Sequence, residues 1–109
     1  MNEELCQQTE HITQLADRML GLVYDLLARN NITPNNVQRQ MLSSHVRAMA
    51  HRAVTREPLP EVEASLFDEV SEDSLKLARA VVDKFGNLPE PDPETWLLSV
   101  HVEVAKGNL

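Results

Sequence analysis

The chain has 109 residues, an apolar content of 42%, three glycines and a formal net charge of −7. This size suits a single domain, residues 1–109, with a small hydrophobic core. The acidic charge argues against direct nucleic-acid binding, because phosphate recognition needs clustered Lys and Arg. One cysteine excludes an internal disulfide framework, and neither a transmembrane run nor a signal-peptide pattern is present in the sequence. We therefore expect a cytoplasmic protein without membrane contact.

The first half of the chain predicts two helices. Residues 3–29 place apolar side chains at three- and four-residue steps, as in an amphipathic helix, and Asn30 and Asn31 can end it. Thr33-Pro34 predicts the start of a second helix, with a capping hydroxyl and a proline at the first helical position, which runs to about Thr55. Arginines along this helix and just after it make a local basic face on an acidic chain, suited to a protein partner or an anionic group: Arg39, Arg47, Arg52 and Arg56.

The second half predicts three more helices. Prolines in residues 56–60 interrupt the second helix, and a short third helix is expected at 61–70. Ser71 caps a fourth helix, which Gly86 ends. A fifth helix is expected to begin at Asp92-Pro93. The apolar residues expected to point inward from it are Trp96, Leu97, Val100 and Val104. With no convincing strand or repeat, the predicted fold is all-α, a compact five-helix bundle.

A histidine and an arginine stand seven residues apart on the second predicted helix. Such residues lie within about 20° of each other around a helix. If the buried stripe contains Leu42, Val46, Met49 and Ala53, then His45 and Arg52 share one flank of it. His51 falls on the solvent side. Periodicity alone favours the plain interpretation that both residues border the core and bond to their neighbours; the alternative is a regulated site.

The last predicted helix repeats this relation, since Glu94 stands seven residues before His101 at the margin of the apolar stripe. His11, by contrast, is expected at the surface of the first helix. A neutral imidazole can accept a phosphoryl group, which adds up to two negative charges at a packing margin. A metal site built on His45 and His101 is the competing interpretation. The sequence has no HExxH motif and no cysteine pair, which argues against this metal site. We therefore expect no bound metal, no cofactor and no enzymatic activity.

Taken together, two segments resemble the PRD, the regulation domain of the bacterial phosphotransferase system found in sugar-operon antiterminators and activators. One segment is His45-Val46-Arg47-Ala48-Met49-Ala50-His51-Arg52, and the other is Glu94-Thr95-Trp96-Leu97-Leu98-Ser99-Val100-His101. The intervening LARAVVDKFGNLP is similar to the family's fourth helix and its exit turn. The resemblance covers about residues 10–106 and implies the PRD-type bundle of five helices.

The resemblance implies that His45 and His101 are phosphorylation sites, with Arg52 supporting the first and Glu94 the second. It implies that the phosphocarrier HPr or a sugar-permease component donates the phosphoryl group. The resemblance also implies a homodimer, whose packing would then pass the signal to a separate regulator protein.

Two departures from the family pattern concern the first site, where Ser44 replaces the common Asp before the histidine and Ala48 replaces a bulky aromatic residue. These departures leave His101 with the fuller match. The chain therefore resembles a stand-alone PRD that regulates transcription through a partner. The alternative is a helical dimerisation module that is not phosphorylated, and a helical DNA-binding regulator is disfavoured by the charge.

Overall fold

Four α-helices are present in the residues that the computed structural model describes, which are 3–59, 70–86 and 88–107. Their bounds are α1 Glu3–Arg29, α2 Asn36–Thr55, α3 Glu72–Phe85 and α4 Pro91–Lys106. The prediction of an all-α chain is confirmed for these residues, but the prediction of five helices is wrong. The expected helix at 61–70 lies, apart from Val70, outside the described residues. A ten-residue apolar pattern is a weak indication of a helix, because short helices depend on tertiary packing.

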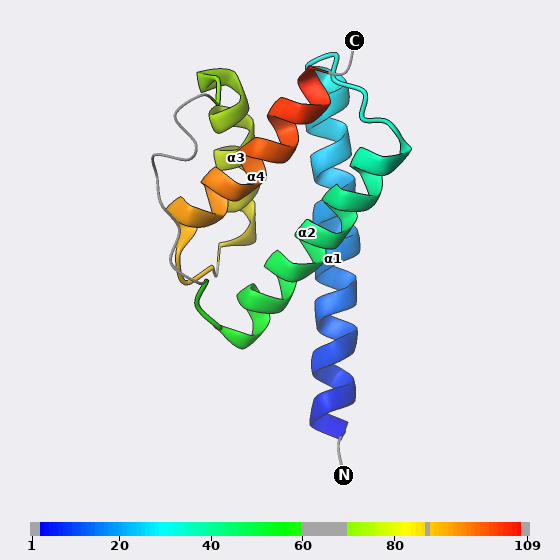
Figure 1. Ribbon diagram of the computed structural model, residues 1–109. Coiled ribbons are helices and arrows are strands. Elements are labelled where there is room, and N and C mark those ends of the chain that lie inside the picture. Colours follow the sequence, from blue (N-terminus) through cyan, green and yellow to red (C-terminus); the bar gives the residue numbers. More distant parts are fainter. Residues whose placement is uncertain (1–2, 60–69, 87, 108–109) are drawn as a thin grey trace.

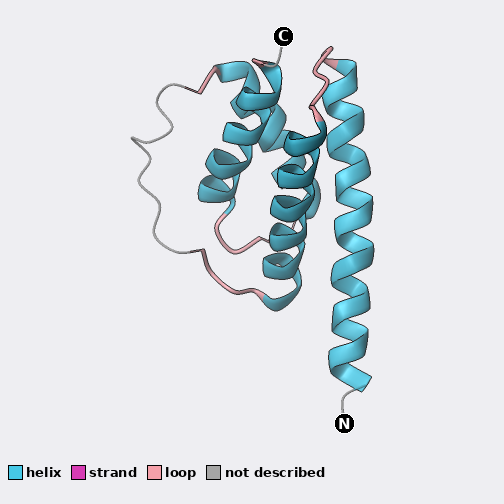
Figure 2. Ribbon diagram, turned by 45° about the vertical axis from the view of Figure 1, so that its right-hand side comes forward, coloured by secondary structure: helices cyan, strands magenta, loops and turns pink. Residues whose placement is uncertain are grey.

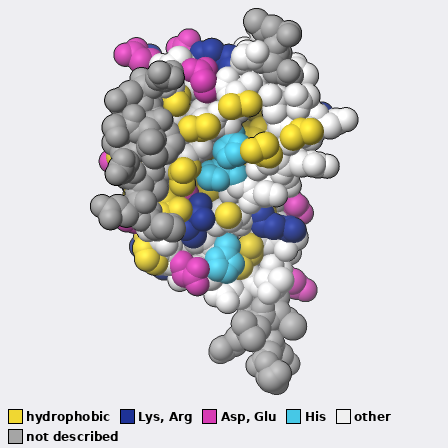
Figure 3. Space-filling view, in the orientation of Figure 1, with side chains coloured by type: hydrophobic (Ala, Val, Ile, Leu, Met, Phe, Trp, Pro, Cys, Tyr) yellow, Lys and Arg dark blue, Asp and Glu magenta, His cyan; other side chains and the backbone are white. Residues whose placement is uncertain are grey.

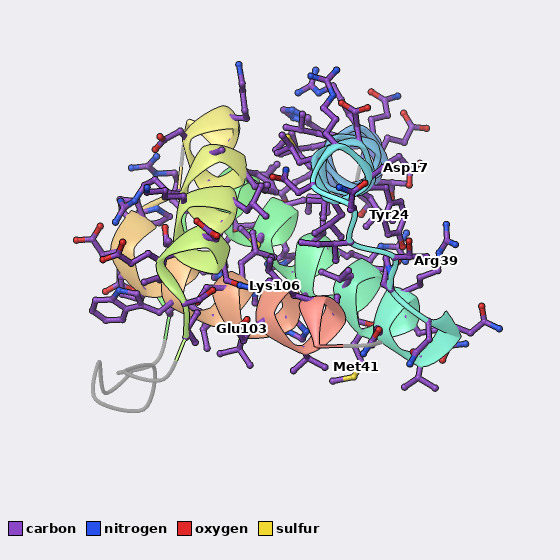
Figure 4. The ribbon with its side chains drawn as sticks, turned by 90° about the horizontal axis from the view of Figure 1, so that it is seen from above. Asp17, Tyr24, Arg39, Met41, Glu103 and Lys106 are labelled. Atoms are coloured by element: carbon purple, nitrogen blue, oxygen red, sulfur yellow. The ribbon has the colours of Figure 1, made fainter. Side chains whose placement is uncertain are left out.

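The four helices pack as two antiparallel hairpins. Helix α1 lies against α2 and helix α3 lies against α4, and the hairpins meet where α1 contacts α3 and α2 contacts α4. Seen from above, α1 and α3 form one layer, and α2 and α4 form the other (Figure 4). Helix α1 extends beyond the other helices at its N-terminal end (Figures 1 and 2). Because α1 and α3 cover only one side of the layer formed by α2 and α4, the other side of that layer forms an outer face of the molecule.

Helix ends follow local side-chain chemistry, although not always where we predicted. Helix α2 begins after Asn35, not after Thr33: the Asn35 side chain accepts a hydrogen bond from the backbone N–H of Gln38 (2.9 Å), and the Gln38 side chain accepts one from the backbone N–H of Asn35 (2.8 Å). This reciprocal pair satisfies two N–H groups that the helix itself leaves free. The predicted roles of Ser71 as N-cap and of Gly86, at φ 74°, as left-handed C-cap are confirmed.

The inward face of α4 differs from the predicted one. Its buried residues are Glu94, Thr95, Leu98, Ser99, Val102 and Ala105. Val104, which we expected in the core, is 54% exposed, and Trp96 is only partly buried. An apolar pattern could not reveal this face because half of it is polar. Thr95 and Ser99 donate hydrogen bonds to the helix's own carbonyl groups, at 2.8 and 2.6 Å, so their hydroxyl groups can be buried.

The hydrophobic core lies between the two layers and draws on all four helices. The predicted α2 stripe is confirmed, since Leu42, Val46 and Met49 are 0% exposed and Ala53 is buried. At one end of the α3–α4 hairpin, the Glu103 carboxylate accepts hydrogen bonds from the backbone N–H of Ser71 (2.7 Å) and the hydroxyl of Ser74 (3.2 Å). These bonds tie the last turns of α4 to the first turn of α3.

Candidate functional site

The two seven-residue pairs predicted from the sequence meet across α2 and α4. The rings of His45 and His101 lie with their centroids 4.8 Å apart, tilted by 39°. Two turns away, Arg52 on α2 binds Glu94 on α4. The order of the contacts shows that the helices run antiparallel here, because the later residue of one helix pairs with the earlier residue of the other. Two histidines therefore face each other at one point and two opposite charges at the next.

The Arg52–Glu94 contact is a two-point ion pair in the interior. The Nε and Nη2 groups of Arg52 donate to the two carboxylate oxygens of Glu94, at 2.6 and 2.7 Å. The side chains are 15% and 1% exposed. Parallel, charge-assisted bonds of this kind fix both distance and orientation. Sequence reasoning attached each residue to the histidine of its own helix and did not foresee that they would bind each other.

His45 is partly buried on the α2 side of the histidine pair. Its Nε2 atom is buried and has no hydrogen-bond partner among the described residues. Burial first, and then the neighbouring His101 and Arg52, lower the pKa of His45 from 6.5 to about 3. Both the low-dielectric surroundings and the nearby cation oppose protonation. His45 is consequently a neutral imidazole at physiological pH.

His101 lies on the more open side of the pair. Burial lowers the pKa of His101 as well, through the same penalty on its charged form. A neutral imidazole keeps one ring nitrogen with a free lone pair, which can accept a hydrogen bond or attack an electrophile. The arrangement thus presents two uncharged nucleophilic rings in contact, beside a guanidinium that is already held by a carboxylate.

The histidine pair opens onto the outer face of α2 and α4. A shallow hollow of about 530 Å³ is lined by Gln40, Met41, Ser44, His45 and His101. Figure 3 shows histidine side chains together on this face, next to apolar side chains. Gln40 and Met41 are the members of this site that sequence reasoning missed. Their position one turn before His45 was the only available sign, since an exposed methionine resembles a core residue in the sequence.

The remaining histidines stand apart from this pair. His51 is exposed, as predicted, with its Nδ1 atom 3.7 Å from a carboxylate oxygen of Glu57, and His11 is exposed on α1. In the part of the chain that the structure describes, no three His, Cys, Asp or Glu side chains are grouped to hold a metal ion. Within the same residues, none of the helices combines the length and the apolar character that a membrane span requires.

The chain was compared with known proteins at the level of sequence and of structure. No family model and no curated protein matches it. Among solved structures it is similar to the crystal structure of a PRD-containing transcription regulator from Lactobacillus casei ATCC 334. The two chains share 36% sequence identity over 88% of this chain and 84% of the other, with a TM-score of 0.81.

Proposed function

The chain belongs to the PRD family, and we propose that it is a cytoplasmic regulatory module of a transcription circuit linked to the bacterial phosphotransferase system. In this proposal, phosphorylation of His101 or His45 controls how the module packs against a second copy or a separate regulator. The observation that carries it is the contact of two neutral histidines, 4.8 Å apart, at the outer edge of the α2–α4 interface. A charge added there acts directly on the packing of two helices.

The chemical step is transfer between imidazoles. The free ring nitrogen of His101 attacks the phosphorus of a phosphohistidine on the donor, which is HPr or a sugar-permease component. One N–P bond forms as the donor's N–P bond breaks, and the proton of the acceptor ring passes to the departing donor imidazole. The lowered pKa values of His45 and His101 support this role, because a protonated imidazole has no lone pair with which to attack.

A phosphoryl group at this position adds up to two negative charges beside the second imidazole. The charge of Arg52 acts on His45 and helps to lower its pKa, and Glu94 already holds this guanidinium. The phosphate therefore competes with a buried carboxylate for one guanidinium. Loss of that guanidinium would leave the Glu94 charge buried and unpaired, which strongly disfavours the existing packing of α2 on α4. This competition is the means by which we propose that phosphorylation changes the surface offered to partners.

One observation favours the second candidate, a structural interaction module without phosphorylation. The Nε2 atom of His45 is buried, and Ser44 and Ala48 depart from the family pattern around it. His101, at the more open side, is therefore the site to which we assign the principal role. The module without phosphorylation predicts that neither histidine accepts a phosphoryl group.

The test is a labelling experiment with phosphoenolpyruvate, enzyme I and HPr, with and without permease components. We expect acid-labile label on the unchanged chain, a large loss in His101→Ala and complete loss in the His45→Ala, His101→Ala double variant. A His11→Ala, His51→Ala double variant is the matched control, since both rings are exposed and lie outside the hollow. Absence of label on the unchanged chain would refute the proposal. Label on the His45→Ala, His101→Ala double variant would refute the site assignment.

A further inference from the structure

We propose that the phosphoryl donor docks on an apolar surface beside the histidine pair, made of Val37, Met41 and Val104 and called the collar below. The proposal rests on the proposed function and names the partner of the same site: a protein that presents a phosphohistidine within an apolar surface. The collar lies next to the hollow, which Met41 also lines.

The collar is formed by the large apolar side chains that are exposed in the described residues. Val37, Met41 and Val104 are 64%, 52% and 54% exposed. Met41 lies one turn before His45 on α2 and also lines the hollow, and Val104 lies one turn after His101 on α4. Figure 4 shows Met41 on the side of α2 that faces away from α1. Exposed apolar residues gathered at a functional site are typical of a protein-binding surface.

The two halves of the collar are held together. The side-chain amide of Gln38, on the first turn of α2, donates a hydrogen bond to the backbone carbonyl of Val104 (3.3 Å). The capping pair of Gln38 and Asn35 fixes the start of the same helix. The collar is therefore largely preformed, which reduces the ordering entropy lost when a partner binds.

The distribution of charge on the chain favours a protein that carries a phosphohistidine as the partner of the collar. The chain carries a formal net charge of −7, yet α2 contains no Asp or Glu and carries Arg39 and Arg47 besides the Arg52 that Glu94 holds. None of the described residues that line the hollow is acidic. A phosphohistidine carries up to two negative charges, so it would be repelled over most of this chain but not at this surface. A second copy of this acidic chain brings no phosphoryl group to the hollow and would cover the histidines that must receive one.

The experiment compares two donors on Val37→Glu and Val104→Glu, two collar residues that do not line the hollow. One donor is phosphorylated HPr or the permease component that labels the unchanged chain, and the other is phosphoramidate, a small donor that needs no docking surface. We expect each substitution to lower kcat/KM for the protein donor at least about tenfold, because hot-spot positions carry most of the binding energy. The rate with phosphoramidate is expected to stay unchanged. Gln14→Glu, exposed on α1, adds the same charge away from the collar and serves as the control.

Two results would overturn the proposal. Equal loss with both donors would mean that the collar acts on the histidines themselves, and unchanged transfer from the protein donor would place docking elsewhere. Sedimentation of the same variants tests the alternative that a second copy of this chain binds the collar. If a substitution converts a dimer to a monomer and leaves transfer from the protein donor unchanged, the collar is a dimer interface. These results differ from the one expected if the proposed function itself is wrong. In that case the unchanged chain would take no label from the protein donor.

Discussion

Arg52 on α2 and Glu94 on α4 form a buried ion pair between helices, with a Glu94 side chain that is 1% exposed and two hydrogen bonds of 2.6 and 2.7 Å. The pair lies two turns from the His45–His101 contact on both helices. It therefore sets how far and at what register α2 and α4 approach at the histidines. A residue that acts in this way is a positioning residue, and its removal is expected to change both stability and the histidine contact.

Loss of Arg52 should strongly destabilise the fold. We expect Arg52→Ala to lower the free energy of unfolding by about 3–5 kcal/mol, because the Glu94 charge is left buried without a partner. Urea unfolding at neutral pH measures the change. Arg79→Ala is the matched control, since the Arg79–Asp92 pair has a similar distance (2.8 Å) but is exposed, and such pairs contribute about 0–1 kcal/mol. Equal losses for the two variants would contradict the positioning role.

The double variant Arg52→Met, Glu94→Leu should be far more stable than Arg52→Ala. Replacement of a whole buried ion pair by apolar side chains of similar volume removes both desolvation penalties and leaves no unpaired charge. We expect an unfolding free energy within about 1 kcal/mol of the unchanged chain. A double variant as unstable as Arg52→Ala would show that packing, and not the unpaired charge, determines the loss.

The unbonded Nε2 atom of His45 should lower stability. A buried polar atom without a hydrogen bond is unfavourable by about 1–3 kcal/mol. We expect His45→Phe, which replaces the imidazole by an apolar ring, to raise the free energy of unfolding by about 1 kcal/mol at neutral pH. Thermal and urea unfolding give the measurement. A clear decrease would indicate that Nε2 has a partner, and a stabilised variant that takes less label would link the unfavourable atom to function.

Stability should fall with acidification. The pKa of His45 is about 3 in the folded chain and 6.5 when unfolded, so between these values the unfolded state binds a proton that the folded state does not. The free energy of unfolding therefore decreases as the pH falls through this window, by up to about 1.4 kcal/mol per pH unit for one group. The lowered pKa of His101 acts in the same direction. Urea unfolding at about pH 7 and pH 5 tests this, and His45→Phe should show a shallower slope.

Two glycines should respond in opposite ways to alanine. Gly86 ends α3 at φ 74°, a conformation that is unfavourable for any residue with a Cβ, so Gly86→Ala should lower the free energy of unfolding by about 1 kcal/mol.

Gly21 lies inside α1, and a Cβ there would meet no atom within 4 Å. Gly21→Ala should raise the free energy of unfolding by up to about 1 kcal/mol. A destabilised Gly21→Ala variant would indicate a surface contact on α1.

Much of the fold could be predicted from local patterns. Apolar spacing identified α1, α2, α3 and α4, and Ser71 and Gly86 were recognised as helix ends, because caps and amphipathic faces depend on residues within a few positions of one another. Spacing of seven residues also marked His45 with Arg52 and Glu94 with His101 as same-face pairs. The start of α2 was misplaced, since a proline near a helix start is a weaker determinant than the bonded Asn35–Gln38 pair.

Partners across helices could not be predicted from a single helix. The inner face of α4 carries Glu94, Thr95 and Ser99, and hydropathy assigns such residues to solvent unless a partner elsewhere satisfies them. For Glu94 that partner is Arg52, 42 residues away, and its position depends on how α2 crosses α4. The sequence by itself determined that the chain is helical, and it placed His45 with Arg52 and Glu94 with His101 on shared helix faces. Only the tertiary structure decided that the two charges neutralise each other in the interior and that the two histidines stand in contact, uncharged, at the edge of a hollow.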